Sequence, residues 1–166
     1  MKKIITVLMI ALLFLGCSKD EELKNVEPKL VVGKSLVNLA LQDQFANPQI
    51  IKPTTTKVIF AFSKDMAHIC NDYFATQTAT YLNDNHTLFI ADVSAAPSLI
   101  RSMFILPGLK DFKHTVLLLD NKALAAPYRA LQDTEKIIVV YLKNQTITDI
   151  KTINSEAELK SVIEVN

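Results

Sequence analysis

Glycine is scarce in this chain, and its scarcity excludes one large class of binding site. Only Gly16, Gly33 and Gly108 occur among the 166 residues. Phosphate-cradling loops and dinucleotide fingerprints need clustered glycines, because the backbone must approach the ligand closely. No such cluster is present, so we expect no nucleotide cofactor, and the sequence indicates no other cofactor.

An excess of positive charge is also missing. The chain has 18 basic and 17 acidic residues, for a net charge of +1 at pH 7. Surfaces that bind nucleic acids carry strong positive charge, because they must neutralise phosphates. We therefore expect no nucleic-acid partner.

The N-terminus has the layout of an export signal. Lys2 and Lys3 are followed by an uncharged apolar run from Ile4 to Leu15, and then by the small residue Gly16. A positive start, an apolar centre and a small residue at the cut site are typical of such signals. The run is shorter than the ~20 residues that a membrane-spanning helix needs. We therefore predict that residues 1–16 are a cleaved signal peptide.

The segment Leu13-Phe14-Leu15-Gly16-Cys17 resembles the lipobox of bacterial lipoproteins, although Phe14 stands where leucine is usual. The resemblance implies that Cys17 becomes the N-terminus and carries acyl chains such as palmitate. Two or three chains anchor a protein stably, whereas one holds only marginally. Ser18 stands where the family places aspartate for inner-membrane retention. We therefore expect a protein of the cell envelope that faces the periplasm from the outer membrane.

Removal of the signal would leave 16 basic and 17 acidic residues, a net charge of −1. Residues 17–31 would then form the lipidated N-terminus and a polar tether containing Pro28, and residues 32–166 a single domain. Once Cys17 is acylated, Cys70 is the only thiol, so no intramolecular disulfide can form.

The hydrophobic pattern alternates strands with helices. We expect an N-terminal hairpin over 36–51, strands over 57–62, 87–93, 115–119, 137–142 and 146–153, and helices over 66–83, 97–107 and from Ser155 to the C-terminus. Asp65 can cap the first helix, and Ser155 with Glu158 forms a capping box. This order predicts an α/β three-layer sandwich with a mixed central sheet.

This order of elements resembles the thioredoxin superfamily, and within it the redoxin and peroxiredoxin branch. The segment from Val32 to Gln44 is similar to the opening hairpin of that branch, with Asn47 near an expected glycine. Val58–Phe62 is similar to the strand that leads to the active site. Val140–Asn144 and the helix from Ser155 are similar to the last hairpin and helix. The resemblance covers residues 32–165 and implies a thioredoxin-like fold.

The chemistry of that family is not preserved. A gap-free alignment lays Ala67-His68-Ile69-Cys70 on the Cys-x-x-Cys box, so Ala67 replaces the cysteine that attacks from the helix start. Dithiol exchange needs two sulfurs, one to attack and one to resolve. The peroxidase pattern fails too, because Ser63 and Ala67 hold the places of its proline and hydroxyl residue. Nor is the family's cis-proline evident. We expect no thioredoxin-type enzyme activity.

Several residues near this box are candidates for function. Cys70 fits either an inert core residue on the apolar helix face or a lone redox thiol. The turn after the buried strand lies where α/β sheets commonly bind ligands. The candidates for a ligand-binding face are Ser63, Lys64, Asp65, Ala67 and His68.

Three functional hypotheses follow. The first is a binding or scaffolding protein of the cell envelope, whose partner is an envelope protein or a small ligand. The second is a redox protein or sensor that uses Cys70. The third is a copper-handling protein, because Met66 and Cys70 lie four residues apart and could offer soft ligands. The three histidines show no ligand spacing, so the leading expectation includes no metal.

Overall fold

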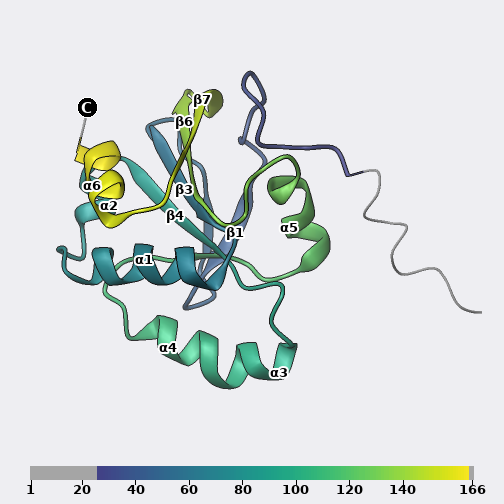
Figure 1. Ribbon diagram of the computed structural model, residues 1–166, viewed down its shortest axis with the longest axis vertical. Coiled ribbons are helices and arrows are strands. Elements are labelled where there is room, and N and C mark those ends of the chain that lie inside the picture. The colour runs from purple at the N-terminus through teal and green to yellow at the C-terminus, as the bar shows by residue number, and fades with distance from the viewer. Residues whose placement is uncertain (1–25, 165–166) are drawn as a thin grey trace, which may run out of the picture.

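The computed structural model describes residues 26–164, which form one seven-stranded sheet with helices on both faces (Figure 1). The strand order is β2-β1-β5-β4-β3-β6-β7. The predicted signal peptide and Cys17 lie outside the described residues. Within 26–164, no helix has the length and apolar character needed to cross a bilayer.

Three parallel strands form the centre of the sheet: β3 (Lys57–Ala61), β4 (Thr87–Asp92) and β5 (Leu117–Leu119). Every residue of β3 is buried, as expected for a parallel strand covered on both faces. The antiparallel hairpin of β6 (Ile137–Lys143) and β7 (Thr146–Ile153) continues the sheet beyond β3. Its two-residue turn has positive φ at Asn144 and Gln145, which matches strand twist.

The other end of the sheet is the N-terminal hairpin of β1 (Ala40–Asp43) and β2 (Pro48–Ile50). The hairpin is present as predicted, but its first strand begins four residues later than expected, at Ala40. The buried carboxylate of Asp43 holds the turn, accepting bonds from the backbone N–H groups of Phe45 and Asn47 at 2.8 and 2.9 Å. Burial alone would raise the pKa of Asp43, but these bonds outweigh it and lower the pKa.

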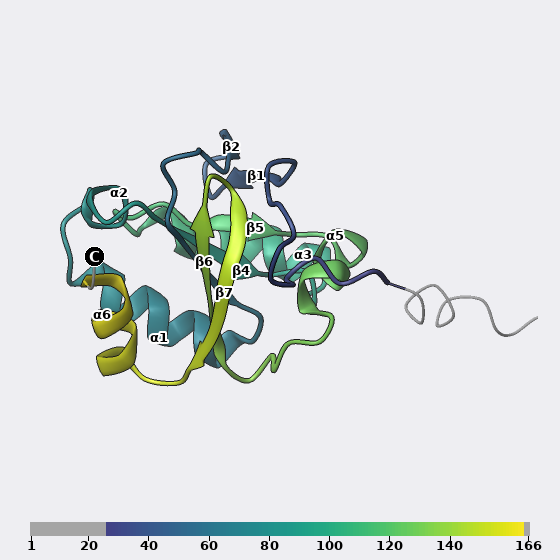
Figure 2. The same cartoon turned by 90° about the horizontal axis from the view of Figure 1, so that it is seen from above.

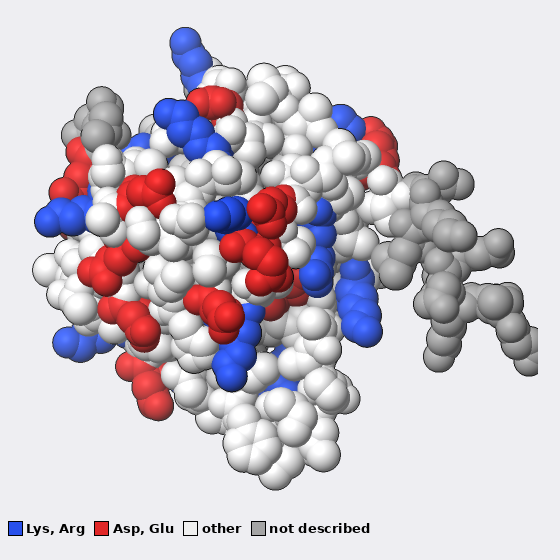
Figure 3. Space-filling model, in the orientation of Figure 1, with Lys and Arg blue, Asp and Glu red and all other residues white. Residues whose placement is uncertain are grey.

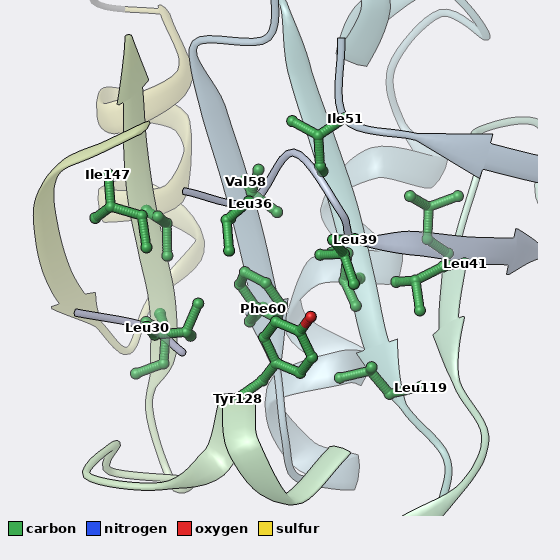
Figure 4. Close-up of a cluster of buried hydrophobic side chains, with 14 of the residues drawn as sticks. Leu30, Leu36, Leu39, Leu41, Ile51, Val58, Phe60, Leu119, Tyr128 and Ile147 are labelled. Atoms are coloured by element: carbon green, nitrogen blue, oxygen red, sulfur yellow. The ribbon is translucent and has the colours of Figure 1, made fainter. Parts of the chain in front are cut away.

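Helices cover the two faces of the sheet. On one face, α1 (Lys64–Ala75) and α6 (Glu156–Glu164) enclose a core that includes Phe74 and Phe89. On the other, α5 (Lys122–Arg129) places Tyr128 against Phe60 in a second core (Figure 4). The expected three-layer arrangement with a mixed sheet is confirmed.

Two helix predictions were wrong in their bounds. The first helix ends at Ala75 instead of continuing to residue 83, and a separate turn, α2 (Tyr81–Asp84), follows it. The helix after Pro97 does not stop at Pro107. It continues from α3 (Ser98–Ile100) through the π-helical turn η1 (Arg101–Ile105) into α4 (Leu106–Lys110). A π turn widens the backbone just ahead of Pro107, so the ring avoids the clash that ends an ordinary α-helix.

The helix α5 was not predicted. Its N-cap is Asn121, whose side chain accepts bonds from the N–H groups of Ala123 and Leu124. The predicted capping box of α6 is present. Glu158 accepts from the Asn154 N–H at 3.0 Å, and the Glu158 N–H donates to the Ser155 hydroxyl at 3.3 Å.

The segment ahead of the first strand is packed against the domain. Leu30, which falls in the predicted tether, is only 2% exposed and lies in the α5-side core. The Lys29 N–H donates to the Pro127 carbonyl at 2.8 Å. Gly33 and Lys34 then exchange backbone bonds with Ile147 at the start of β7. The packed part of the chain therefore begins before residue 32.

Candidate functional site

The start of α1 lies at the carboxyl end of β3, where the ligand-binding face was predicted. Ser63 is the N-cap and has an extended backbone, with φ −115° and ψ 159°. Its hydroxyl forms no cap bond, and the buried oxygen has no hydrogen-bond partner within the described residues. Asp65 is therefore not the cap. It is exposed in the first turn, where its charge favours the positive end of the helix.

Ala67 does not stand at the helix start. Its N–H donates to the Ser63 carbonyl at 3.0 Å, so Ala67 lies one full turn inside α1 and is half-buried. The gap-free alignment with the Cys-x-x-Cys box is therefore out of register with the helix. By position in the fold, Ser63 and Lys64 occupy the helix start, and neither offers a sulfur.

The Cys70 thiol is enclosed. Its side chain is 0% exposed and lies in the α1-side core with Tyr73 and Phe74. Burial raises the pKa of Cys70 well above its ordinary value, because the apolar surroundings disfavour the thiolate. The thiolate is the form that reacts with disulfides and peroxides, so the structure favours the core interpretation of Cys70.

The other candidate residues on α1 do not form a site together with Cys70. Lys64 and His68 are exposed on α1, whereas Met66 is half-buried and packs on the core. Among residues 26–164, no three side chains of the His, Cys, Asp and Glu types cluster closely enough to hold a metal ion. The copper hypothesis gains no support from this arrangement.

A polar cluster that the sequence did not reveal lies at the carboxyl end of β4. The Asp92 side chain is fully buried, and one of its oxygens pairs with Arg129 Nη1 of α5 at 3.2 Å. Its other oxygen accepts the backbone N–H of Ser94 at 2.8 Å. Arg101 donates to the Val93 carbonyl at 3.3 Å. The two arginines of the chain therefore both contact the same strand end. The sequence contains no other arginine, and this scarcity was the one local indication that the two residues have a specific role.

This cluster has the chemistry of a structural element. The carboxylate of Asp92 is neutralised by Arg129, and the arginine joins α5 to the sheet. The buried Ser94 hydroxyl has no hydrogen-bond partner in the described part of the chain. No thiol belongs to the cluster, since Cys70 lies in the core on the α1 side.

The buried His114 lies in an aromatic environment. Its Nε2 lies 3.0 Å from the Asn71 side-chain oxygen, and the rings of Phe74 and Phe112 lie 5.4 and 5.0 Å from its own. Burial lowers the pKa of His114 to about 4, because the core disfavours the imidazolium. His114 is therefore a neutral core residue near pH 7.

A groove of about 510 Å³ separates the β1–β2 hairpin from α4. Its apolar lining includes Leu41, Leu106 and Leu118, and the cations Arg101 and Lys110 lie along it together with Asp120. The groove lies apart from Cys70, which does not line it.

Comparisons with known proteins were informative at the level of structure only. No family model and no curated protein matches the sequence. Among solved structures, peroxidoxin BcpB from Mycobacterium tuberculosis is similar with a TM-score of 0.53 and 12% identity, over 80% of this chain and 93% of that one. A putative protein disulfide isomerase from Bacteroides thetaiotaomicron gives a TM-score of 0.54 and 12% identity, over 84% and 90%.

The fold is thioredoxin-like. A third neighbour agrees: the bacterioferritin comigratory protein of Xanthomonas campestris has a TM-score of 0.51 and 8% identity, over 77% of this chain and 89% of that one. The predicted superfamily resemblance is thus confirmed for the fold. At these identities the likeness concerns the backbone, and the redox activities named for the neighbours do not transfer with it.

Proposed function

We propose that this chain is a lipid-anchored, thioredoxin-like protein of the cell envelope that binds a partner and does not catalyse thiol or peroxide chemistry. The observation that carries this proposal is the burial of Cys70, the one thiol that would remain after acylation of Cys17. Cys70 is fully buried on the apolar side of α1, and its pKa is raised by burial. The start of the same helix carries Ser63 and Lys64.

The absence of a second sulfur weighs against disulfide exchange. After acylation of Cys17, no other cysteine exists to resolve a mixed disulfide. A hydroxyl at the helix start is no substitute, because serine oxygen is a poor nucleophile without an adjacent base. Ser63 has no hydrogen-bond partner among residues 26–164 that could take its proton.

The anchoring part of the proposal rests on the sequence. The apolar run, Gly16 and Cys17 have the order of a lipoprotein signal, and Ser18 favours the outer membrane. Mass spectrometry of the mature N-terminal peptide tests this directly. We expect acyl chains on Cys17, and an unmodified Cys17 would contradict the anchor.

The non-catalytic part is tested by turnover assays on the purified protein. We expect neither insulin disulfide reduction nor peroxide consumption above the rate without protein, both for the natural chain and for Cys70→Ser. Turnover by the natural chain that disappears in Cys70→Ser would overturn the proposal and establish the redox-thiol alternative.

Thiol labelling gives an independent measure. A maleimide should leave Cys70 unmodified in the folded protein and modify it fully after unfolding, because labelling needs an accessible thiolate. A surface variant such as Ser102→Cys is the matched control, since Ser102 is exposed and should label at once. Rapid labelling of Cys70 without denaturant would count against a buried thiol.

A further inference from the structure

An exposed apolar face lies on the helical segment 98–110. Leu99 is 64% exposed, Ile100 44%, Met103 58% and Phe104 65%. Single exposed hydrophobic residues are ordinary, but a contiguous group on one short segment marks a contact surface. We call these four residues the apolar face. In Figure 3 an uncharged protrusion occupies the lower edge, where Figure 1 places α3 and α4.

The segment is fixed to the domain by its other side. Leu109 is buried, and Ile105 and Leu106 pack against the α1-side core. Arg101, at the start of η1, bonds the Val93 carbonyl. The apolar face is therefore held in place on a supported helix, with its side chains directed away from the core.

The helical segment that carries the apolar face has basic residues and no acidic ones. From Pro97 to Lys110 the only charged residues are Arg101 and Lys110, and no acidic residue occurs. Lys113 follows shortly after Asp111. Helical segments that combine Leu and Phe on one side with basic residues beside them are typical of helices that lie in a membrane interface. Anionic lipid would match this charge.

The N-terminal anchor keeps the domain near the bilayer. This step rests on the proposed acylation of Cys17. Lys29 is the first described residue with a backbone hydrogen bond to the folded domain, and twelve residues from Cys17 span at most roughly 40 Å. A domain of this size has a radius of gyration of about 14 Å. The domain therefore cannot move much more than its own width from the membrane.

The tether leaves the domain at a place separate from the apolar face. In Figure 1 the start of the described chain is at the right, α3 is at the lower edge and α6 is at the left (Figure 2 shows the same chain from above). The reach of the tether, roughly 40 Å, is comparable to the width of the domain, so a bilayer that holds the N-terminus can still contact the apolar face.

We propose that the apolar face is a second membrane contact: Leu99, Ile100, Met103 and Phe104 insert into the bilayer interface beside the lipid anchor. The lipid on Cys17 holds the protein at the membrane, and the apolar face sets its orientation. In that orientation β7 and α6, which lie away from α3 in Figure 1, are directed toward the periplasm.

The absence of tryptophan from the chain makes a direct test possible. The acylated proteins F104W and V37W are each reconstituted into phosphatidylcholine–phosphatidylglycerol vesicles, with and without bromine on the acyl chains. Val37 is a matched control, because it is 49% exposed and follows the segment paired with β7.

Because an interfacial helix inserts its apolar side about 5–10 Å deep, we expect bromine to reduce F104W emission roughly twofold or more. The V37W emission should stay unchanged. Omission of phosphatidylglycerol should weaken the F104W quenching. Circular dichroism melting curves that match the natural protein establish that both variants fold.

Three outcomes separate the possibilities. Mass spectrometry of the same preparation reports acylation, so an unacylated chain contradicts the proposed anchor and not the apolar face. Acylated F104W with no more quenching than V37W overturns the membrane contact. The variant F104C, treated in cell envelopes with a thiol-linked photocrosslinker, adds a further arm: attachment to a protein without quenching in vesicles would assign the face to a protein partner and also overturn the proposal.

Discussion

The two longest runs of helix on the α1 side of the sheet treat their apolar residues in opposite ways. The helix α1 buries Cys70, Tyr73 and Phe74 in the core, whereas the segment 98–110 leaves four large apolar side chains exposed. The comparison shows that two helical segments on one side of a sheet can differ in what they leave accessible to solvent. Burial suppresses the chemistry of Cys70, the one free cysteine among residues 26–164, and exposure leaves a surface for contact. Each prediction below tests or sharpens this contrast.

The largest expected effect is a difference in the unfolding free energy lost when each of two phenylalanines is replaced by alanine. Phe74 is 1% exposed and packs its ring 5.3 Å from Phe89, whereas Phe104 is 65% exposed. We expect Phe74→Ala to lower the free energy of unfolding by about 3–5 kcal/mol, because it leaves a cavity in the core. Phe104→Ala should change it by less than about 0.5 kcal/mol. Urea denaturation measures both, and equal losses would contradict the assignment of the two environments.

The core behind α1 should also make stability depend on pH. The folded pKa of His114 lies at about 4, below the value near 6.5 of an unfolded histidine. The unfolded chain therefore binds a proton that the folded chain excludes, so stability is full above pH 6.5 and falls as the pH drops toward 4. We expect a loss of up to about 3 kcal/mol across that window.

Two histidine variants isolate this contribution. His114→Gln should flatten the fall in unfolding free energy between pH 6.5 and 4, whereas His68→Gln should leave it unchanged, because His68 is exposed. Denaturation at several pH values measures the slope. A slope that persists in His114→Gln would assign the effect to other groups.

A smaller effect is expected at Cys70. Cys70→Ser places a hydroxyl in an apolar pocket and should destabilise the fold by about 1–3 kcal/mol, because the buried hydroxyl loses its hydrogen bonds with water. Ser102→Cys on the exposed segment should be neutral. Thermal melts compare the two, and a neutral Cys70→Ser would mean that the thiol is not enclosed.

The smallest expected change in unfolding free energy comes from removing the side-chain cap at the start of a helix. The helix α6 begins with the Ser155–Glu158 capping box, whereas α3 has no side-chain cap. Ser155→Ala should therefore cost about 1 kcal/mol. Ser98→Ala at the start of α3 should change the unfolding free energy negligibly. Equal effects in denaturant titrations would show that the capping box does not stabilise α6.

The central sheet could be predicted because its strands are unbroken apolar runs. Val58–Phe60 and Ile137–Val140 are buried on both faces, so their sequence alone indicates their place. The capping box at Ser155 was equally local. The burial of Cys70 followed from its helical phase with Tyr73 and Phe74.

Other features depend on contacts that the sequence does not display. Asp92 and Arg129 are 37 residues apart, and only the fold brings α5 against the end of β4. The helix α5 contains Pro127, which normally argues against a helix. The segment after Ala75 lacks glycine and proline, so nothing local marked the end of α1. The helix α1 begins at Lys64, so Ala67 lies one turn inside it and not at its start, where the alignment had placed it.

The bonding of residues 29–36 has a mechanical consequence for an anchored protein. Lys29 is bonded to the α5 side of the domain, and Gly33 and Lys34 are bonded to the start of β7. A pull on the N-terminal chain would therefore load these backbone bonds before the rest of the domain. The strain falls on the sheet edge and on the end of α5, while the helix that encloses Cys70 lies off the line of force.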